Sequence, residues 1–219
     1  MPAFIPAKPK AAYQLTFGGS WPMAVAFLGS GNKLAAANQL GQIYIWDLPD
    51  KAPAGAKPGG KDRTAPNLDP TRRLDGHTNE ISRIAATPDG KKLLSASYDR
   101  TIRIWPTDGP VAGKVEAFMD GETGKRVTAK TASKVPAAGG GIMIDSQTAC
   151  DVLAGHNDWI FTLGLSGDGK RAISGDTACK AIVWDLTTLK SIASWTGQNT
   201  NWVVSASLSA DGRTALVSE

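Results

Sequence analysis

The sequence predicts an all-β fold made of repeated four-stranded antiparallel units, and two observations support this. Short runs of alternating apolar residues are separated by Gly, Asp or Asn, which is the pattern of strand, turn and strand rather than of helix. The spacing of two segments is also the same, because 28 residues separate His77 from Trp105 and His156 from Trp184. In both segments an Asp-Gly pair begins 12 residues after the histidine. The chain therefore contains internal repeats.

The best-preserved unit covers residues 74–105. A Gly-His pair lies near its start, and we expect its first three strands near 81–86, 92–98 and 101–106. The first two strands are joined by Pro-Asp-Gly, a tight-turn sequence in which glycine accepts a positive φ. A second turn, at Asp99, joins the second strand to the third.

The other units are recognised by their closing tryptophan or by their turn. Repeats are expected near 13–48, 71–106, 142–186 and 189–219, with inserts at 49–70 and 106–141. Fourth strands are expected near 71–74, 144–153 and 189–195, with a further one at 13–17. The first insert is rich in Pro, Gly and Lys and predicts a flexible surface loop, whereas the second contains a hairpin-like segment.

Composition indicates a globular chain and argues against several other classes. The 219 residues are 42% hydrophobic and include 24 Gly and 13 Pro, which suits a fold with many turns. No segment approaches the roughly 18 apolar residues of a membrane span, and no apolar core follows Lys8 and Lys10 as in a signal peptide. Two cysteines do not make a disulfide framework. We therefore expect a cytoplasmic protein without membrane contact.

The repeated motifs resemble those of the WD-repeat (WD-40 type) β-propeller family, over most of the chain outside the inserts. The matching segments are Gly76-His77, Asp89-Gly90, Ser95-Ala96-Ser97, Asp99, Trp105, Gly155-His156, Asp168-Gly169, Ser174-Gly175, Trp184-Asp185 and Trp46-Asp47. The resemblance implies four-stranded antiparallel blades, of which about three and a half are present, whereas a closed ring needs at least about four. We expect an incomplete ring that is part of a longer propeller. The alternative is self-association of two arcs through open blade edges.

The same resemblance implies a buried hydrogen-bonded network in each complete blade. Its members here are a histidine, a strand hydroxyl, a turn aspartate and a tryptophan: His77, Ser97 (or Ser95), Asp99 and Trp105. The carboxylate accepts from the imidazole, and the hydroxyl can bond the imidazole while accepting from the indole N–H. Each such bond contributes about 1 kcal/mol. We therefore assign both histidines of the chain a structural rather than a catalytic or metal-binding role.

The other copies depart from this pattern at the turn. Ala178 occupies the turn-aspartate position of the unit closed by Trp184, and Asp176 occupies its hydroxyl position. Leu40 and Asn38 stand at these positions in the first unit. We therefore expect only one blade to hold the full network and the others to rely more on packing.

A less conventional pattern lies nine residues before each Pro-Asp-Gly-type turn position. The residues there are Trp21, Glu80, Trp159 and Trp202, at the start of the first strand of each unit. In a propeller this loop face surrounds the mouth of the central channel. Tryptophan is enriched at binding hot spots because it combines a large apolar area with an N–H donor. These four residues are the candidate partner-binding site, and packing against the neighbouring blade is the alternative.

The leading functional hypothesis is a non-catalytic protein–protein interaction scaffold that binds a protein or peptide on the loop face. The sequence has no recognisable nucleophile–base motif, phosphate-binding loop or Cys/His metal spacing, so we predict no enzyme activity, cofactor or metal. The alternative is the propeller portion of a larger enzyme or sensor whose catalytic part lies outside this chain. Nucleic-acid binding is a lesser alternative, because no aromatic residues interleave the basic residues of the first insert.

Overall fold

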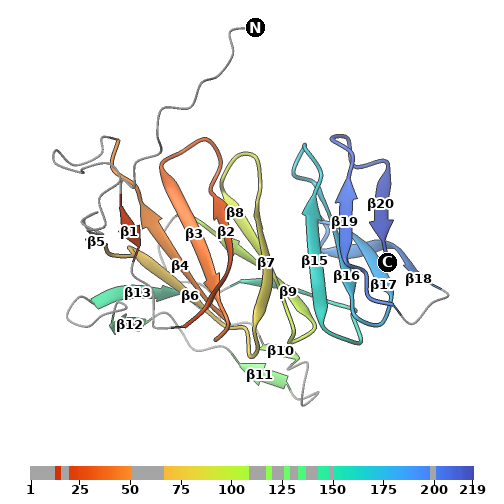
Figure 1. Cartoon of the computed structure of the whole chain (residues 1–219), viewed down its shortest axis with the longest axis horizontal. Coiled ribbons are helices and arrows are strands. Elements are labelled where there is room, and N and C mark those ends of the chain that lie inside the picture. Colours follow the sequence, from red (N-terminus) through yellow and green to blue (C-terminus); the bar gives the residue numbers. More distant parts are fainter. Residues whose placement is uncertain are drawn as a thin grey trace, which may run out of the picture.

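A computed structural model describes residues 13–15, 20–50, 67–108, 117–119, 126–128, 133–136, 143–147, 150–197 and 201–219. All regular elements in these ranges are β-strands, which confirms the predicted all-β fold. Figure 1 shows the sheets side by side, from the strands that follow the N-terminus to β19 and β20 at the C-terminus. No helix long and apolar enough to cross a membrane is found in the described ranges.

The central sheets are three consecutive antiparallel blades followed by a two-stranded half-blade. Blade 1 contains β2 (Pro22–Phe27), β3 (Lys33–Asn38), β4 (Gln42–Asp47) and β6 (Arg72–Asp75). Blade 2 contains β7 (Ile81–Ala86), β8 (Lys92–Ser97), β9 (Thr101–Pro106) and β14 (Asp151–Ala154). Blade 3 contains β15 (Ile160–Leu165), β16 (Arg171–Asp176), β17 (Lys180–Asp185) and β18 (Lys190–Thr196). The half-blade pairs β19 (Ser205–Leu208) with β20 (Ala215–Ser218).

The Asp-Gly turns between first and second strands have one geometry in blades 2 and 3 and in the half-blade. Their glycines have φ between 66° and 69°, a region that favours glycine. A Thr or Ser hydroxyl two residues before each aspartate donates to its carboxylate at 2.6 Å, and the aspartate also accepts a backbone N–H. These pairs are Thr87–Asp89, Ser166–Asp168 and Ser209–Asp211. These carboxylates stabilise the turns by local hydrogen bonds, as the Asp-Gly sequence predicts.

Two further strands, one inside the second insert and one just after it, extend blade 1. β13 (Met143–Gln147) pairs parallel with β6, and β12 (Ser133–Pro136) pairs antiparallel with β13, so that blade 1 becomes part of a six-stranded sheet. The predicted fourth strand at 144–153 is therefore two strands, β13 in the first sheet and β14 in blade 2. A hairpin of β10 (Ala117–Met119) and β11 (Arg126–Thr128) confirms the hairpin-like pattern. The flexible loop predicted for the first insert falls mainly on residues 51–66, which lie outside the described residues.

The prediction that residues 13–17 form a fourth strand of a blade is wrong for the part that is described. β1 (Gln14–Leu15) instead pairs parallel with β5 (Asn67–Leu68). Leu15 and Leu68 pack against a buried cluster that contains Trp46, and the Trp46 indole donates to the Leu68 carbonyl oxygen at 3.0 Å. Ala36 stands where a hydroxyl could accept from this indole in the other blades, so the backbone of β5 supplies the acceptor.

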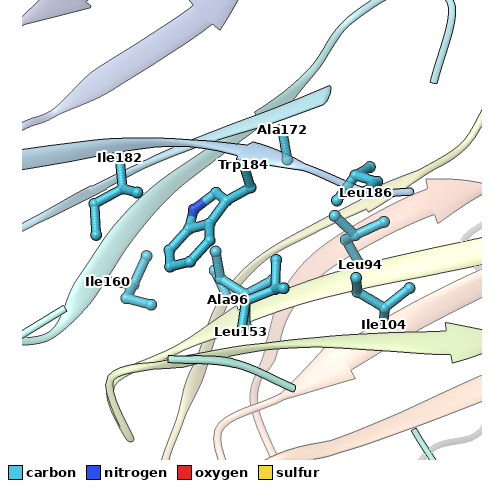
Figure 2. Close-up of a cluster of buried hydrophobic side chains, with 10 residues drawn as sticks. Leu94, Ala96, Ile104, Leu153, Ile160, Ala172, Ile182, Trp184 and Leu186 are labelled. Atoms are coloured by element: carbon cyan, nitrogen blue, oxygen red, sulfur yellow. The ribbon is translucent and has the colours of Figure 1, made fainter. Parts of the chain in front are cut away.

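Apart from the cluster around Trp46, the hydrophobic clusters of the described residues lie between neighbouring blades. Figure 2 shows the cluster between blades 2 and 3, where the Trp184 ring points toward Ile160, Ala96 and Leu153. A matching cluster joins blades 1 and 2 around Trp105. The half-blade packs on blade 3 through Val203 and Ala206. Because each interface depends on both of its blades, the arc is stabilised by nearest-neighbour contacts, as in repeat proteins.

Candidate functional site

The histidine network of blade 2 is buried and fully connected. His77 Nδ1 lies 2.7 Å from Asp99 Oδ2, and His77 Nε2 lies 2.7 Å from Ser95 Oγ. The Trp105 indole donates to the same Ser95 oxygen at 2.9 Å. Asp99 Oδ1 also accepts from the Thr101 amide and hydroxyl. Since both ring nitrogens of His77 are engaged, the residue fastens loops and strands and cannot bind a metal.

The hydroxyl of this network comes from Ser95, and the assignment of Ser97 is wrong. Both serines point to the same side of β8, because side chains alternate along a strand. Leu93 is the cross-strand partner of Trp105. On the side of β8 that Leu93 occupies, Ser95 is the next residue and Ser97 is the one after it, so Ser95 lies nearer to the indole. The Ser97 hydroxyl instead donates to the Asn79 carbonyl oxygen at 3.1 Å and accepts from the Asp99 amide at 3.0 Å.

Blade 3 holds a second complete network, contrary to the expectation that only one blade would. His156 Nδ1 lies 2.7 Å from Asp176 Oδ2, and its Nε2 lies 2.7 Å from Ser174 Oγ, which accepts from the Trp184 indole at 2.8 Å. Asp176 ends β16 on the same side as Ser174, so its carboxylate reaches the histidine without a turn aspartate. Its other oxygen accepts from the Ala178 and Lys180 amides.

Blade 1 retains only the backbone part of this arrangement. Asn38 occupies the position of Asp176, and its side-chain oxygen accepts from the Leu40 and Gln42 amides at 3.0 Å each. Ala36 removes the hydroxyl, and Gly18, at the histidine position, lies outside the described residues. A side-chain oxygen therefore accepts backbone amides in the turn between the second and third strands of all three blades. The hydrogen bond from this side chain to a histidine is described in blades 2 and 3.

Burial sets the charge states of the blade 2 network. Burial lowers the pKa of His77 and outweighs the nearby Asp99 carboxylate, so the imidazole is neutral, with Nδ1–H donating to Asp99 and Nε2 accepting from Ser95. Burial alone would raise the pKa of Asp99, but its interactions with His77 and Thr101 hold that pKa well below its usual range. The network is thus a neutral imidazole against a carboxylate.

These directions predict that the protein loses stability on acidification below pH 7. A lowered pKa of His77 means that the unfolded chain takes up a proton first, near the ordinary histidine pKa of about 6.5. The melting temperature should therefore fall by a few degrees between pH 7.5 and 5.5, and His77→Gln should flatten this slope. Calorimetry across this range is the measurement, and a melting temperature that rises toward pH 5.5 contradicts a neutral His77.

The four residues predicted to bind a partner occupy one end of the blades. The backbone hydrogen bonds here are equivalent in the three blades. In each blade a backbone amide of the turn between the second and third strands donates to the carbonyl oxygen of Trp21, Glu80 or Trp159. We call this end the loop face, defined by the turns at 98–100 and 177–179 and the loop at 155–159. Trp21 is 76% exposed, Trp159 44% and Trp202 50%, while Glu80 is half-buried.

The tryptophans of blade 3 and the half-blade contact the blade before them. The Trp159 ring stacks on Tyr98 of blade 2, with centroids 5.0 Å apart and an interplanar angle of 14°. Trp202 tilts against Phe161 of blade 3 at 5.6 Å, and the Arg83 guanidinium lies 5.5 Å from the Phe161 centroid. We call Tyr98, Trp159, Phe161 and Trp202 the aromatic row. Trp21 makes no ring contact with the row among the described residues.

The sequence pattern found two members of this row and missed the other two. Tyr98 lies in a turn and Phe161 lies inside β15, and neither position carries an aromatic residue in more than one blade. Burial raises the pKa of Tyr98, and Glu80 adds to the effect, so the phenol stays neutral beside the row. No cluster of His, Cys, Asp and Glu suited to a metal ion exists in the described part of the chain. The exposed tryptophan rings of the row offer apolar surface on the loop face.

Comparison with known proteins places WD40 repeats in this chain. The family model "WD domain, G-beta repeat" matches residues 68–106 and 147–185. These two segments contain most of blades 2 and 3. The predicted resemblance is confirmed at the two units that carry complete histidine networks.

The curated relatives match only part of the chain. Target of rapamycin complex subunit LST8 of Saccharomyces cerevisiae is 31% identical over 98 residues, which cover 45% of this chain and 28% of the relative. Protein LST8 homolog of Drosophila melanogaster is 37% identical over 84 residues, covering 38% and 24%. Small ribosomal subunit protein RACK1 of Caenorhabditis elegans is 35% identical over 63 residues, covering 29% and 17%. The matched part therefore spans between 17% and 28% of these relatives. Two of these names describe subunits of larger assemblies.

Proposed function

Because the chain carries WD40 repeats, we propose that it is a non-catalytic scaffold that binds a protein or peptide on its loop face. The observation that carries this proposal is the aromatic row, which crosses from blade 2 through blade 3 to the half-blade. Tryptophan and tyrosine dominate binding hot spots because they bury a large area at little entropic cost. The names of the LST8 and RACK1 relatives, which describe complex or ribosomal subunits, favour the same class of function.

The rigid blades explain how such a surface could discriminate between partners. The histidine networks fix the loops on which Trp159 and Tyr98 lie. The stacked rings of these two residues therefore form a preorganised apolar surface. Preorganisation reduces the entropy lost on binding and so favours affinity. Part of each residue remains accessible to a partner, since Trp159 and Trp202 are each about half exposed.

Replacing Trp159 and Trp202 together by alanine should weaken partner binding at least about 30-fold, the size of two or more kcal/mol at a hot spot. The aromatic contacts with Tyr98 and Phe161 are worth about 0.5–1.5 kcal/mol each, so the melting temperature should fall by only a few degrees. Affinity for partners captured from the native host is measured by surface plasmon resonance.

Trp195→Ala is the matched control, because Trp195 is 38% exposed but lies on the outer strand β18. Binding should be unchanged in this variant. The proposal fails if the double variant binds normally and unfolds much more easily, since the two tryptophans would then act only in packing between blades.

A further inference from the structure

A pocket of about 370 Å³ opens on the loop face between blades 2 and 3. Residues 99–101, from the turn between β8 and β9, line one side. Residues 154–157, from the loop between β14 and β15, line the other. The same two segments lead directly to Tyr98 and Trp159, so the pocket adjoins the stacked pair of the aromatic row. A partner lying on these rings would reach the pocket.

Arg100 is the unusual residue of this pocket. Its φ is 69°, a left-handed conformation that is uncommon for residues other than glycine. Gly41 and Cys179 take the equivalent turn position in blades 1 and 3, with φ of 76° and 61°. Glycine would therefore serve the turn of blade 2 better than arginine. The left-handed backbone is common to the three turns, so the arginine side chain is what distinguishes the turn of blade 2.

The Arg100 guanidinium has no partner within the described part of the chain. Its Nε–H is buried and donates to no acceptor there, and no described carboxylate forms an ion pair with it. The neighbouring Asp99 cannot serve, because its oxygens are occupied by His77, Thr78 and Thr101. A buried donor without an acceptor is costly, so a rearrangement of the Arg100 side chain that brings its guanidinium to an acceptor in the pocket would be favourable.

The charge around the pocket favours an anion. Lys180 Nζ donates to the carbonyl oxygen of Gly155, a residue of the pocket lining, at 2.7 Å, so a second cation lies near the pocket without lining it. Asp99 is the carboxylate that lines the pocket, but His77 and the cationic Arg103 interact with it inside blade 2. Arg100 is therefore the cation that lines the pocket, and guanidinium groups bind carboxylates through paired hydrogen bonds.

We infer that this pocket receives the carboxylate of an Asp or Glu side chain from a partner peptide whose apolar side chain lies on the Tyr98–Trp159 pair. The inference rests on the proposed function and specifies the chemistry of the ligand. The expected recognition element is an acidic residue close in sequence to an aromatic or aliphatic one. The Arg100 guanidinium binds the carboxylate, and Lys180 adds electrostatic attraction.

The test uses the full chain and a displayed library of random twelve-residue peptides. Wild type should select peptides with Asp or Glu beside an apolar residue. Replacing that acid by Gln or Asn in a synthetic peptide should weaken binding to wild type at least about tenfold, the range expected for a charged hydrogen bond. The same change should have no effect on binding to Arg100→Gly, so the two substitutions should be non-additive.

Arg100→Gly is suited to this test because glycine accepts the left-handed conformation, so its melting temperature should be unchanged or higher. Arg100→Asn, which also tolerates that conformation, is the second variant, and nitrogen-15 NMR of the Arg100 Nε–H should show a shift when the acidic peptide binds. Selection of peptides without acids, or equal binding by wild type and both variants, overturns the inference and leaves the proposed function intact. Failure of every chain to select peptides overturns both.

Discussion

Replacing Asp176 by alanine is expected to lower the free energy of unfolding by about 3 kcal/mol, because each buried donor that loses its acceptor costs about 1–3 kcal/mol. The variant leaves His156 without its acceptor and leaves the Ala178 and Lys180 amides unbonded. For a chain of this size, the melting temperature should fall by about 6–12 °C. Urea or thermal denaturation followed by tryptophan fluorescence measures the change.

Asp176→Asn separates two roles of this side chain, the bond to His156 and the bonds to the amides of the turn. Asn38 already accepts from the corresponding amides of blade 1, so asparagine should preserve the turn and lose only the carboxylate–imidazole bond. We expect about 1–2 kcal/mol for this variant. If Asp176→Ala costs less than about 1 kcal/mol, blade 3 relies on packing, and the network does not stabilise it.

Gly175→Ala should have the second large effect, about 2–3 kcal/mol, because it overfills the contact between blade 3 and the half-blade. A Cβ atom at this position would overlap the Val203 side chain and lie 3.0 Å from Thr162 Cγ2. Ala37 and Ala96 take the equivalent positions in blades 1 and 2, so the requirement for glycine is particular to this interface.

The matched control for this prediction is Gly31→Ala. A Cβ atom there would meet only the Leu28 carbonyl oxygen at 3.7 Å, an ordinary contact, so stability should change by less than about 0.5 kcal/mol. Denaturation of the two variants side by side tests whether the half-blade is docked on blade 3. Equal stability of both would show that Val203 does not pack against Gly175.

The strands of blades 2 and 3 were predictable because local signals agree there. Alternating apolar residues and Asp-Gly turns place β7, β8 and β9 within one residue of the expected bounds. The strands whose partners are distant in sequence were not predictable in this way. Whether residues 143–147 join blade 1 or blade 2 depends on pairing with β6, and no local pattern encodes that choice.

The histidine networks also could not be predicted fully from the sequence. Aligning the repeats by sequence position places Asp176 against Ser97 and Ala178 against Asp99, which suggests a missing carboxylate. In space, Asp99 from the turn and Asp176 from the strand end both reach their histidine at 2.7 Å. The physical requirement is a carboxylate near Nδ1, and two backbone positions satisfy it. Function is therefore better compared between blades by contacts than by alignment.

The candidate binding surface was only partly visible in the sequence. Trp21, Glu80, Trp159 and Trp202 were found because they share a repeat position, but only Trp159 and Trp202 belong to the aromatic row. Tyr98, Phe161 and Arg100 follow no repeat, and their importance depends on contacts across blades. Their place on the loop face emerges only when the blades are arranged side by side.

Hydroxyl-radical footprinting of the tryptophans tests most directly the claim that a partner binds on the loop face. The full chain is labelled with and without its captured partner, and oxidation of each tryptophan is measured by mass spectrometry. Trp159 and Trp202 should be protected by the partner, whereas Trp195, on β18 and also partly exposed, should be oxidised equally in both samples. Protection of Trp195 with unchanged oxidation of Trp159 and Trp202 would contradict the account.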